Sequence, residues 1–204
     1  MKKLIIALTL LSIIACKDNE VKKEEPSLIE AVQNVNKLNK AADSMKEYEK
    51  QTEKLKKIKP VSNEVFKQVL TEELGNLKRS SFNAGNASMA GLSSSDATYG
   101  DSNDKNVKIS IFDGAGESGS ALIAITHMSI AMDTESIEGT KTKKTEVING
   151  VRSITENDTN PDSYKRSSIT FIYNDRYQVS LEGNKMPLEE LKTYIQKLNF
   201  SKLP

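Results

Sequence analysis

The sequence is short of the residues on which most catalytic and metal chemistry depends. It contains one Cys, one His and no Trp among 204 residues. One Cys excludes an internal disulfide, and one His cannot supply the clusters that most zinc sites and Ser/His or Cys/His catalysis need. The 29 basic and 28 acidic residues nearly cancel, so we predict no nucleic-acid partner. We expect a non-enzymatic protein without a cofactor.

The N-terminus, by contrast, carries the pattern of a secretory signal. Lys2 and Lys3 precede an uncharged, mostly apolar stretch over residues 4–14. At about 1.5 Å of rise per residue, this stretch is too short as a helix to cross the roughly 30 Å hydrocarbon core of a bilayer. We therefore expect residues 1–15 to be a cleaved signal peptide rather than a permanent membrane span.

The end of this segment resembles a bacterial lipobox. The residues are Ile13, Ile14, Ala15 and Cys16, with an aliphatic residue three positions before the cysteine and a small residue directly before it. The resemblance implies cleavage between Ala15 and Cys16 and attachment of acyl chains such as palmitate at Cys16, which would anchor the protein to a membrane. Lys17 replaces the aspartate that favours inner-membrane retention, which implies the outer membrane. Whether the domain faces the periplasm or the cell surface stays open.

A tether and a helix are predicted after the lipid site. Residues 16–26 are almost all polar, which predicts a lipidated tether. Residues 27–59 begin with a capping-box pattern at Ser27 and Glu30 and contain no Gly or Pro, so they predict a long charged amphipathic helix. A heptad stripe within it consists of Leu28, Ala31, Val35, Leu38, Ala42 and Met45. Because the stripe is short, both an oligomeric stalk through residues 28–58 and a helix packed on the domain stay open.

Residues 60–204 predict a globular α+β domain. The pattern favours an antiparallel sheet of about five to six strands whose apolar face is covered by about two or three helices. We expect an amphipathic helix over 62–77, a second over 120–132 that is apolar almost all round and therefore buried, and a last one over 187–198. Strands are expected at 107–111 and, as short edge strands, around 79–82 and 94–99.

Two hairpins are also predicted. Asn149 and Gly150 form a two-residue turn signal between strands at 140–148 and 150–156. In the second hairpin, a three-residue loop ending at Arg176 would place all six alternating apolar residues on one face. The predicted cross-strand pairs are Tyr173 with Tyr177, Phe171 with Val179 and Ile169 with Leu181.

Part of the domain resembles a group of uncharacterised bacterial envelope proteins. The resemblance lies in the stretches 72–79, 97–100 and 107–113 and in the strand-turn-helix of 177–198. A PsbP-like α/β/α sandwich is one fold that it implies. The group has no established activity from which a substrate could be expected. Because a lipid-anchored domain would lie among other envelope components, we expect its binding partner to be another envelope protein or a glycan.

The glycine-rich segment after the strand at 107–111 is the weak candidate for nucleotide binding or enzymatic activity. Gly114, Gly116 and Gly119 fit the pattern G-x-G-x-x-G, and Asp133 stands about 20 residues after the first of them. However, the strand before the glycines alternates like one buried on a single face, and the strand after the helix is polar. These features favour a turn that binds no ligand.

The remaining candidates are weaker. Asp158, Asn160 and Asp162 alternate like the first ligands of a calcium loop, but the later Gly and bidentate Glu are missing, which favours an ordinary turn. His127 lies in the apolar segment 120–132, where we predict a satisfied core histidine.

Two acids beside the glycines, Asp113 and Glu117, could carry out acid–base chemistry. No spacing selects them as a pair.

Overall fold

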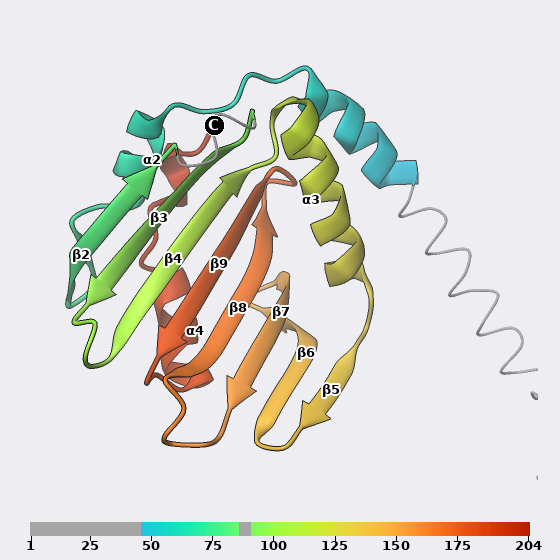
Figure 1. Cartoon of the computed structure of the whole chain (residues 1–204). Coiled ribbons are helices and arrows are strands. Elements are labelled where there is room, and N and C mark those ends of the chain that lie inside the picture. The colour runs from blue at the N-terminus through green and yellow to red at the C-terminus, as the bar shows by residue number, and fades with distance from the viewer. Residues whose placement is uncertain (1–45, 86–90) are drawn as a thin grey trace, which may run out of the picture. The chain divides into compact units, whose positions relative to one another are not determined.

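The computed structural model describes residues 46–85 and 91–204. The predicted signal peptide (1–15), Cys16, the predicted tether and residues 27–45 of the predicted long helix lie outside these ranges. A helix at residues 46–56 comes first. It is followed by α2 (Asn63–Val69), β1 (Glu73–Leu74), β2 (Leu77–Ala84), β3 (Ser93–Gly100), β4 (Asn106–Asp113), α3 (Gly116–Ala131), β5 (Glu135–Glu138), β6 (Lys141–Ile148), β7 (Val151–Asp158), β8 (Lys165–Tyr173), β9 (Tyr177–Asn184), α4 (Leu188–Ile195) and the 3-10 helix η2 (Phe200–Lys202) (Figure 1).

The strands form a single sheet in which every pair of neighbouring strands is antiparallel, although their order across the sheet differs from their order in the sequence. In the described part of the chain it has 9 strands in the order β1-β2-β3-β4-β9-β8-β7-β6-β5. The predicted α+β class with an antiparallel sheet is confirmed, whereas the prediction of about five to six strands was too low. The two edge strands were missed because β1 has only 2 residues and the 4 residues of β5 are all exposed, so neither has an apolar alternation.

Strand β3 corrects the prediction of a short edge strand around 94–99, because it lies inside the sheet. It is a full strand of 8 residues, with Ser93, Ser95, Ala97 and Tyr99 on the buried side, and it pairs with β2 and β4 along its length. Ser and Ala carry little hydrophobic signal. Their small side chains nevertheless fit the crowded position between two strands and the helices that cover this face.

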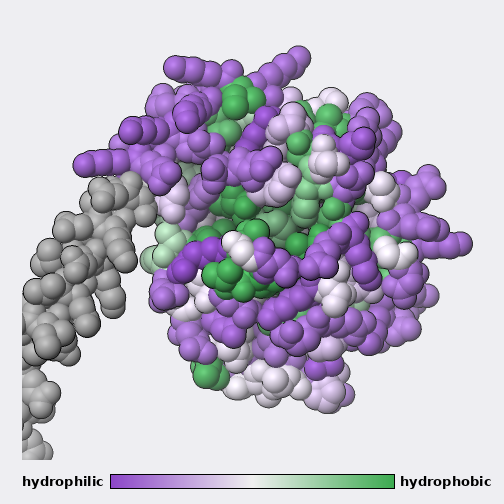
Figure 2. All heavy atoms as spheres, turned by 180° about the vertical axis from the view of Figure 1, so that it is seen from behind, coloured by the Kyte–Doolittle hydropathy of each residue, from purple (hydrophilic) through white to green (hydrophobic). Residues whose placement is uncertain are grey.

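The hydrophobic core lies on one face of the sheet. Alternate residues of β4, β8 and β9 are fully or almost fully buried there against α2, α4 and η2; they include Val107, Ile109, Ile111, Ile169, Phe171, Val179 and Leu181. Figure 1 shows α4 behind the sheet. Seen from behind, this covered face has hydrophobic side chains gathered at its centre and hydrophilic ones around them (Figure 2).

Both predicted hairpins are confirmed. Asn149 and Gly150 join β6 and β7 with positive φ angles of 51° and 82°, the left-handed pair that a type I′ turn requires. Tyr173 pairs with Tyr177, and the two pairs beyond it follow the predicted register. The three-residue loop therefore places its apolar side chains on the covered face.

Two helix predictions were wrong in their bounds. The helix α2 ends at Val69 rather than near residue 77, because Leu74 and Leu77 belong to β1 and β2. The long charged helix is not shown: within the described residues it covers only 46–56, and it ends before residue 59. No helix among the described residues is long and apolar enough to cross a membrane.

The prediction that the apolar segment 120–132 forms a buried helix was also wrong. Only one side of α3 is buried, with Ile123 at 1% and Ile130 at 7% exposure. Leu122, Ile125 and Met128 are 43%, 61% and 48% exposed. The reason is that α3 lies on the face of the sheet opposite α4, where it is flanked on one side by the helix at 46–56 and on the other by open sheet.

Candidate functional site

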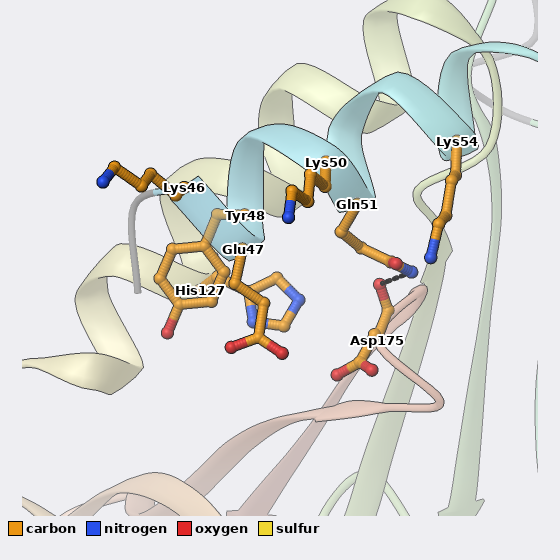
Figure 3. A pocket seen from close by; sticks show the side chains of 8 residues that line it. All are labelled: Lys46, Glu47, Tyr48, Lys50, Gln51, Lys54, His127 and Asp175. Carbon is orange, nitrogen blue, oxygen red and sulfur yellow. Dashed lines mark hydrogen bonds between the residues drawn. The ribbon is translucent and has the colours of Figure 1, made fainter. Parts of the chain in front are cut away.

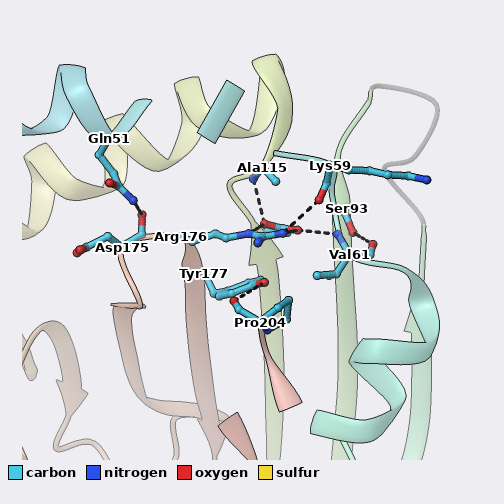
Figure 4. A network of polar contacts seen from close by, with 10 residues as sticks. Gln51, Lys59, Val61, Ser93, Ala115, Asp175, Arg176, Tyr177 and Pro204 are labelled. Atoms are coloured by element: carbon cyan, nitrogen blue, oxygen red, sulfur yellow. Dashed lines mark hydrogen bonds and ion pairs between the residues drawn. The ribbon is translucent and has the colours of Figure 1, made fainter. Parts of the chain in front are cut away.

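The predicted acid Asp113 is part of a buried polar network at the end of β4 (Figure 4). Its carboxylate is fully buried and accepts hydrogen bonds from Arg176 Nε at 2.7 Å and Arg176 Nη2 at 2.8 Å. It also accepts the backbone N–H groups of Val61 and Ala115, at 2.8 and 3.0 Å. All these contacts come from the protein itself. Asp113 thus fastens the segment before α2 to the sheet.

The glycine-rich turn after Asp113 is closed by packing. A Cβ on Gly114 would collide with the side chain of Ile123 and lie 2.8 Å from the carbonyl oxygen of Arg176. A Cβ on Gly119 would lie 2.9 Å from the carbonyl oxygen of Asp113. Gly116 has a φ of +81°. These glycines allow α3 to pack closely on the end of β4, whose neighbours β3 and β9 are both antiparallel, unlike the parallel sheet of dinucleotide-binding folds.

Asp158 and its neighbours form the turn between β7 and β8. The Asp158 carboxylate accepts hydrogen bonds from Thr140 Oγ1 at 2.7 Å, from the Asn160 backbone N–H at 2.9 Å and from Ser163 Oγ. These hydrogen bonds lower the pKa of Asp158 to about 2, and the bond from Ser163 has the largest effect. Asn160 Oδ1 in turn accepts the N–H of Asp162 at 3.0 Å. The three residues act as a turn, and no metal-ligating cluster occurs in the described ranges.

His127 differs from the satisfied core histidine that the sequence predicts. It is half-buried under the helix at 46–56, where its ring stacks on Tyr48 with centroids 4.8 Å apart (Figure 3). Its Nε2 is buried and has no hydrogen-bond partner in the part of the chain that the structure describes. Burial lowers the pKa of His127, against the opposing effects of the Asp175 backbone and the Asp175 and Glu47 carboxylates.

A cavity of about 680 Å³ opens beside this histidine. It is lined by Lys46, Glu47, Tyr48, Lys50, Gln51, Lys54, His127 and Asp175. Figure 3 shows Lys50 and Lys54 extending from the helix on the same side as Glu47 and Gln51, while Lys46 points away at the start of the helix. Gln51 Nε2 donates a hydrogen bond to the Asp175 backbone carbonyl at 3.3 Å. The lining carries both charge signs, and the cavity lies in the seam between the helix at 46–56 and the sheet with α3.

The open face of the sheet is mainly polar and largely uncovered, although Phe112, Ile154 and Ile172 also lie on it. Side chains that alternate with the core residues point to it from β3, β4, β9 and β8: Asp96, Lys108, Ser110, Ser168, Thr170, Gln178, Ser180 and Glu182. Several pair with each other across strands. Ser110 Oγ donates to Asp96, the hydroxyls of Thr170 and Ser180 lie 3.0 Å apart, and Lys165 Nζ lies 2.8 Å from Glu182 Oε2.

A cleft of about 250 Å³ runs where α3 meets this open face. Its floor is formed by Ser168, Thr170 and Gln178 and its wall by Ile125, Thr126 and Ser129 of α3; Lys143, Ile154 and Glu156 complete the lining. Thr126 Oγ1 donates to Gln178 Oε1 at 2.6 Å. The short side chains of Ser168 and Thr170 leave space above the sheet beside α3. The cleft therefore combines a helix wall with a row of hydrogen-bond donors and acceptors.

The predicted candidates and this surface do not coincide. The glycines and Asp113 lie at one turn, Asp158 lies at another, and neither lines the cleft. The signal that could have found the surface was present in the sequence, because hydroxyl, amide and charged residues alternate with the core residues of β4, β8 and β9. Comparison of the chain with protein-family models, with curated proteins and with solved structures gave no match.

Proposed function

We propose that the protein is a lipid-anchored lipoprotein of the bacterial envelope, in the outer membrane, and that its domain is a binding module rather than an enzyme. The lipobox-like residues Ile13–Cys16 support the anchor. The polar open face of the sheet, with the cleft beside α3, supports the binding role and is the observation that carries it. The layered order of α4, sheet and α3 supports the finer assignment to a PsbP-like α/β/α sandwich.

The chemistry of the open face fits a polar partner. An antiparallel sheet can leave one face in water without further function, but here a helix wall bounds the face and forms a cleft. The hydroxyl groups of Ser168 and Thr170 and the amide of Gln178 at this floor can both donate and accept hydrogen bonds, and the Glu156 carboxylate beside them can accept. They can exchange their cross-strand bonds for bonds to a glycan or to polar groups of another envelope protein, at little net cost.

The anchor is tested by substitution of Cys16. In cells that express C16A, we expect loss of acyl labelling and release of the protein from the membrane fraction, because a single lipid-modified residue provides the attachment. Retention of unlabelled C16A in the membrane fraction would contradict the anchor.

The binding role is tested by filling the cleft. T170R places a long charged side chain on the floor, whereas T193R makes the same change at an exposed position of α4 on the opposite face. With cell-wall glycan and crosslinked envelope extract as probes, we expect T170R to lose the capture that the unsubstituted protein and T193R retain. Equal capture by both variants would exclude the open face as the binding surface.

A further inference from the structure

The single histidine of the chain lies between α3 and the helix at 46–56. The ring of His127 stacks on Tyr48, and its Nε2 is buried without a hydrogen-bond partner among the described residues (Figure 3). A neutral imidazole can leave one nitrogen as an unused lone pair, whereas protonation makes both nitrogens donors. Because a buried donor without an acceptor is costly, this packing favours the neutral ring.

The charged groups around His127 come from three neighbouring elements. Those of the helix at 46–56 are Lys46, Glu47, Lys50 and Lys54, that of the loop after β8 is Asp175, and that of β7 is Arg152. The other charged residue of α3 is Glu117, in the first turn of that helix. Burial lowers the pKa of His127, and the opposing effects of Asp175 and Glu47 are smaller.

The sign of the pH dependence follows from this direction. When packing lowers the pKa of a histidine, the packed arrangement is fully stable above the ordinary value of about 6.5. It loses stability as the pH falls below that value, because the unpacked ring then binds a proton that the packed ring resists. Mild acid therefore weakens the contact between His127 and Tyr48.

The first half of the helix at 46–56 is held loosely, unlike the chain that follows it. Residues 46–54 are all exposed or half-buried, and cavities of about 680 and 440 Å³ flank Tyr48. Gln51 adds one hydrogen bond of 3.3 Å to the Asp175 backbone. By contrast, Leu55 is 1% exposed, and the backbone N–H of Val61 is bound by the buried Asp113. Segments with few buried contacts open at a lower free-energy cost than the core.

The same ring contact covers apolar surface. A third cavity, of about 310 Å³, is lined by both rings and by Ile130, Ala131, Val151 and Ile172. Ile130 is 7% exposed in the packed arrangement. Movement of Tyr48 away from His127 would open this cavity to the solvent, so one contact links a titratable group to a covered apolar surface.

We infer that His127 is a pH-sensitive latch, whose protonation in mild acid releases the first half of the helix at 46–56 and exposes the apolar cavity beside Tyr48. In the released state, both nitrogens of the charged ring can donate to water. The part from Leu55 onwards stays attached, so the sheet keeps its structure. The device is a two-state element biased by one proton. It does not depend on the open sheet face or on the partner proposed for that face.

The test compares hydrogen exchange of the full chain with that of H127F, both carrying C16S so that no lipid is attached. H127F keeps a ring on which Tyr48 can stack but cannot be protonated. Comparison at the same pH cancels the intrinsic pH dependence of exchange. We expect equal rates over residues 46–54 at pH 7.5. At pH 5 the chain with His127 should exchange severalfold faster there, while the amides of β4 and β9 stay protected in both proteins.

Two further measurements do not depend on the folding of H127F. Because the sequence has one histidine, the imidazole signals in NMR report its titration directly, and the midpoint should lie below about 6.5. Y48A removes the stacked ring and should exchange fast over residues 46–54 at both pH values. H127Q, which also cannot be protonated, should show no additional release in acid.

Three results would overturn the inference. The histidine could titrate at or above its ordinary pKa, which would mean that packing does not resist the proton. The chains with His127 and with H127F could exchange equally at pH 5. The amides of β4 and β9 could lose protection together with residues 46–54, which would mean that acid unfolds the whole domain instead of opening one helix.

Discussion

The two faces of the sheet are built from the same strands but by different rules. Leu181 and Ser180 are consecutive in β9, yet Leu181 is fully buried against the helices, whereas Ser180 points to the open face and bonds to Thr170. On the covered face, large apolar side chains dominate. On the open face, most side chains are small, polar or charged and several bond to each other across strands, although Phe112, Ile154 and Ile172 also lie on this face. The buried apolar area is therefore concentrated on the covered face, and the open face is the one to which we assign the proposed binding role.

The comparison also explains α3. This helix lies on the open face, where Ile123 and Ile130 are its buried large side chains and where the sheet beside it offers hydroxyl groups together with Ile154 and Ile172. Its attachment depends on close packing at the glycine turn instead. The chain crosses from the covered to the open face at this turn, between Asp113 and Gly119.

The largest effect is expected at that crossing. R176A leaves the Asp113 carboxylate buried without its cation and should lower the free energy of unfolding by about 3–5 kcal/mol. K165A, which breaks the exposed ion pair with Glu182 on the open face, should cost about 1 kcal/mol or less. Urea denaturation of the two variants measures the difference in their free energies of unfolding. Equal losses would contradict this prediction and would mean that water solvates the Asp113 carboxylate when Arg176 is removed.

The next effect compares consecutive residues of β9. L181A leaves a cavity in the core and should cost about 2–5 kcal/mol. S180A removes one hydrogen bond at the open face and should cost about 1 kcal/mol or less. Thermal and urea unfolding of both variants are the measurement. A large loss in S180A would show that the open face is structural and would weaken its assignment as a binding surface.

A third effect is a loss of stability at alkaline pH, which we expect from the ionisation of Tyr99 on the covered face. Burial raises the pKa of Tyr99 to about 12, while its hydroxyl donates to the Thr71 carbonyl oxygen at 3.0 Å. A pKa raised above that of the unfolded chain, about 10, stabilises the fold fully below pH 10. That contribution, about 2–3 kcal/mol, is lost as the pH rises through 12. Stability measured from pH 8 to 12 should therefore fall less in Y99F, and parallel curves would contradict this.

The smallest effect is expected at acid pH, in the turn after β7. The pKa of Asp158 is lowered to about 2 by its hydrogen bonds, so its carboxylate stabilises the fold above the unfolded pKa near 4 and loses this effect as the pH falls towards 2. D158N should be less stable at pH 7 and should show a flatter decline between pH 4 and 2. Calcium should leave the melting temperature of both proteins unchanged, and a rise with calcium in the unsubstituted protein alone would revive a metal role.

Local patterns predicted much of the covered face. The register of the β8–β9 hairpin followed from alternation and loop length, because a shift by one residue would turn every apolar side chain to the wrong face. The β6–β7 turn followed from Asn149 and Gly150, because these two residue types readily adopt the positive φ angles that a two-residue turn requires. Strand β3 was predicted only as a short edge strand at 94–99, whereas it runs from Ser93 to Gly100 inside the sheet; Ser and Ala at its buried positions carry little hydrophobic signal although they fit beneath α2.

The candidate site was predicted less well. The glycines, Asp113 and Asp158 stood out as chemistry-bearing patterns, and in the fold they serve packing, a buried ion pair and a turn. The partner of Asp113 lies 63 residues away, so no local pattern could name it. The cleft is formed by α3 and by strands that follow it in sequence, and its lining appears only when these segments meet.

The sequence by itself determined the class of the domain, the hairpin registers and the lipobox-like pattern that ends at Cys16, because each depends on residues close together in the chain. Only the tertiary structure decided which side of α3 is buried. A helix that is apolar all round has no preferred side of its own, and its orientation came from the glycine turn, the neighbouring helix at 46–56 and a sheet whose apolar face was already covered.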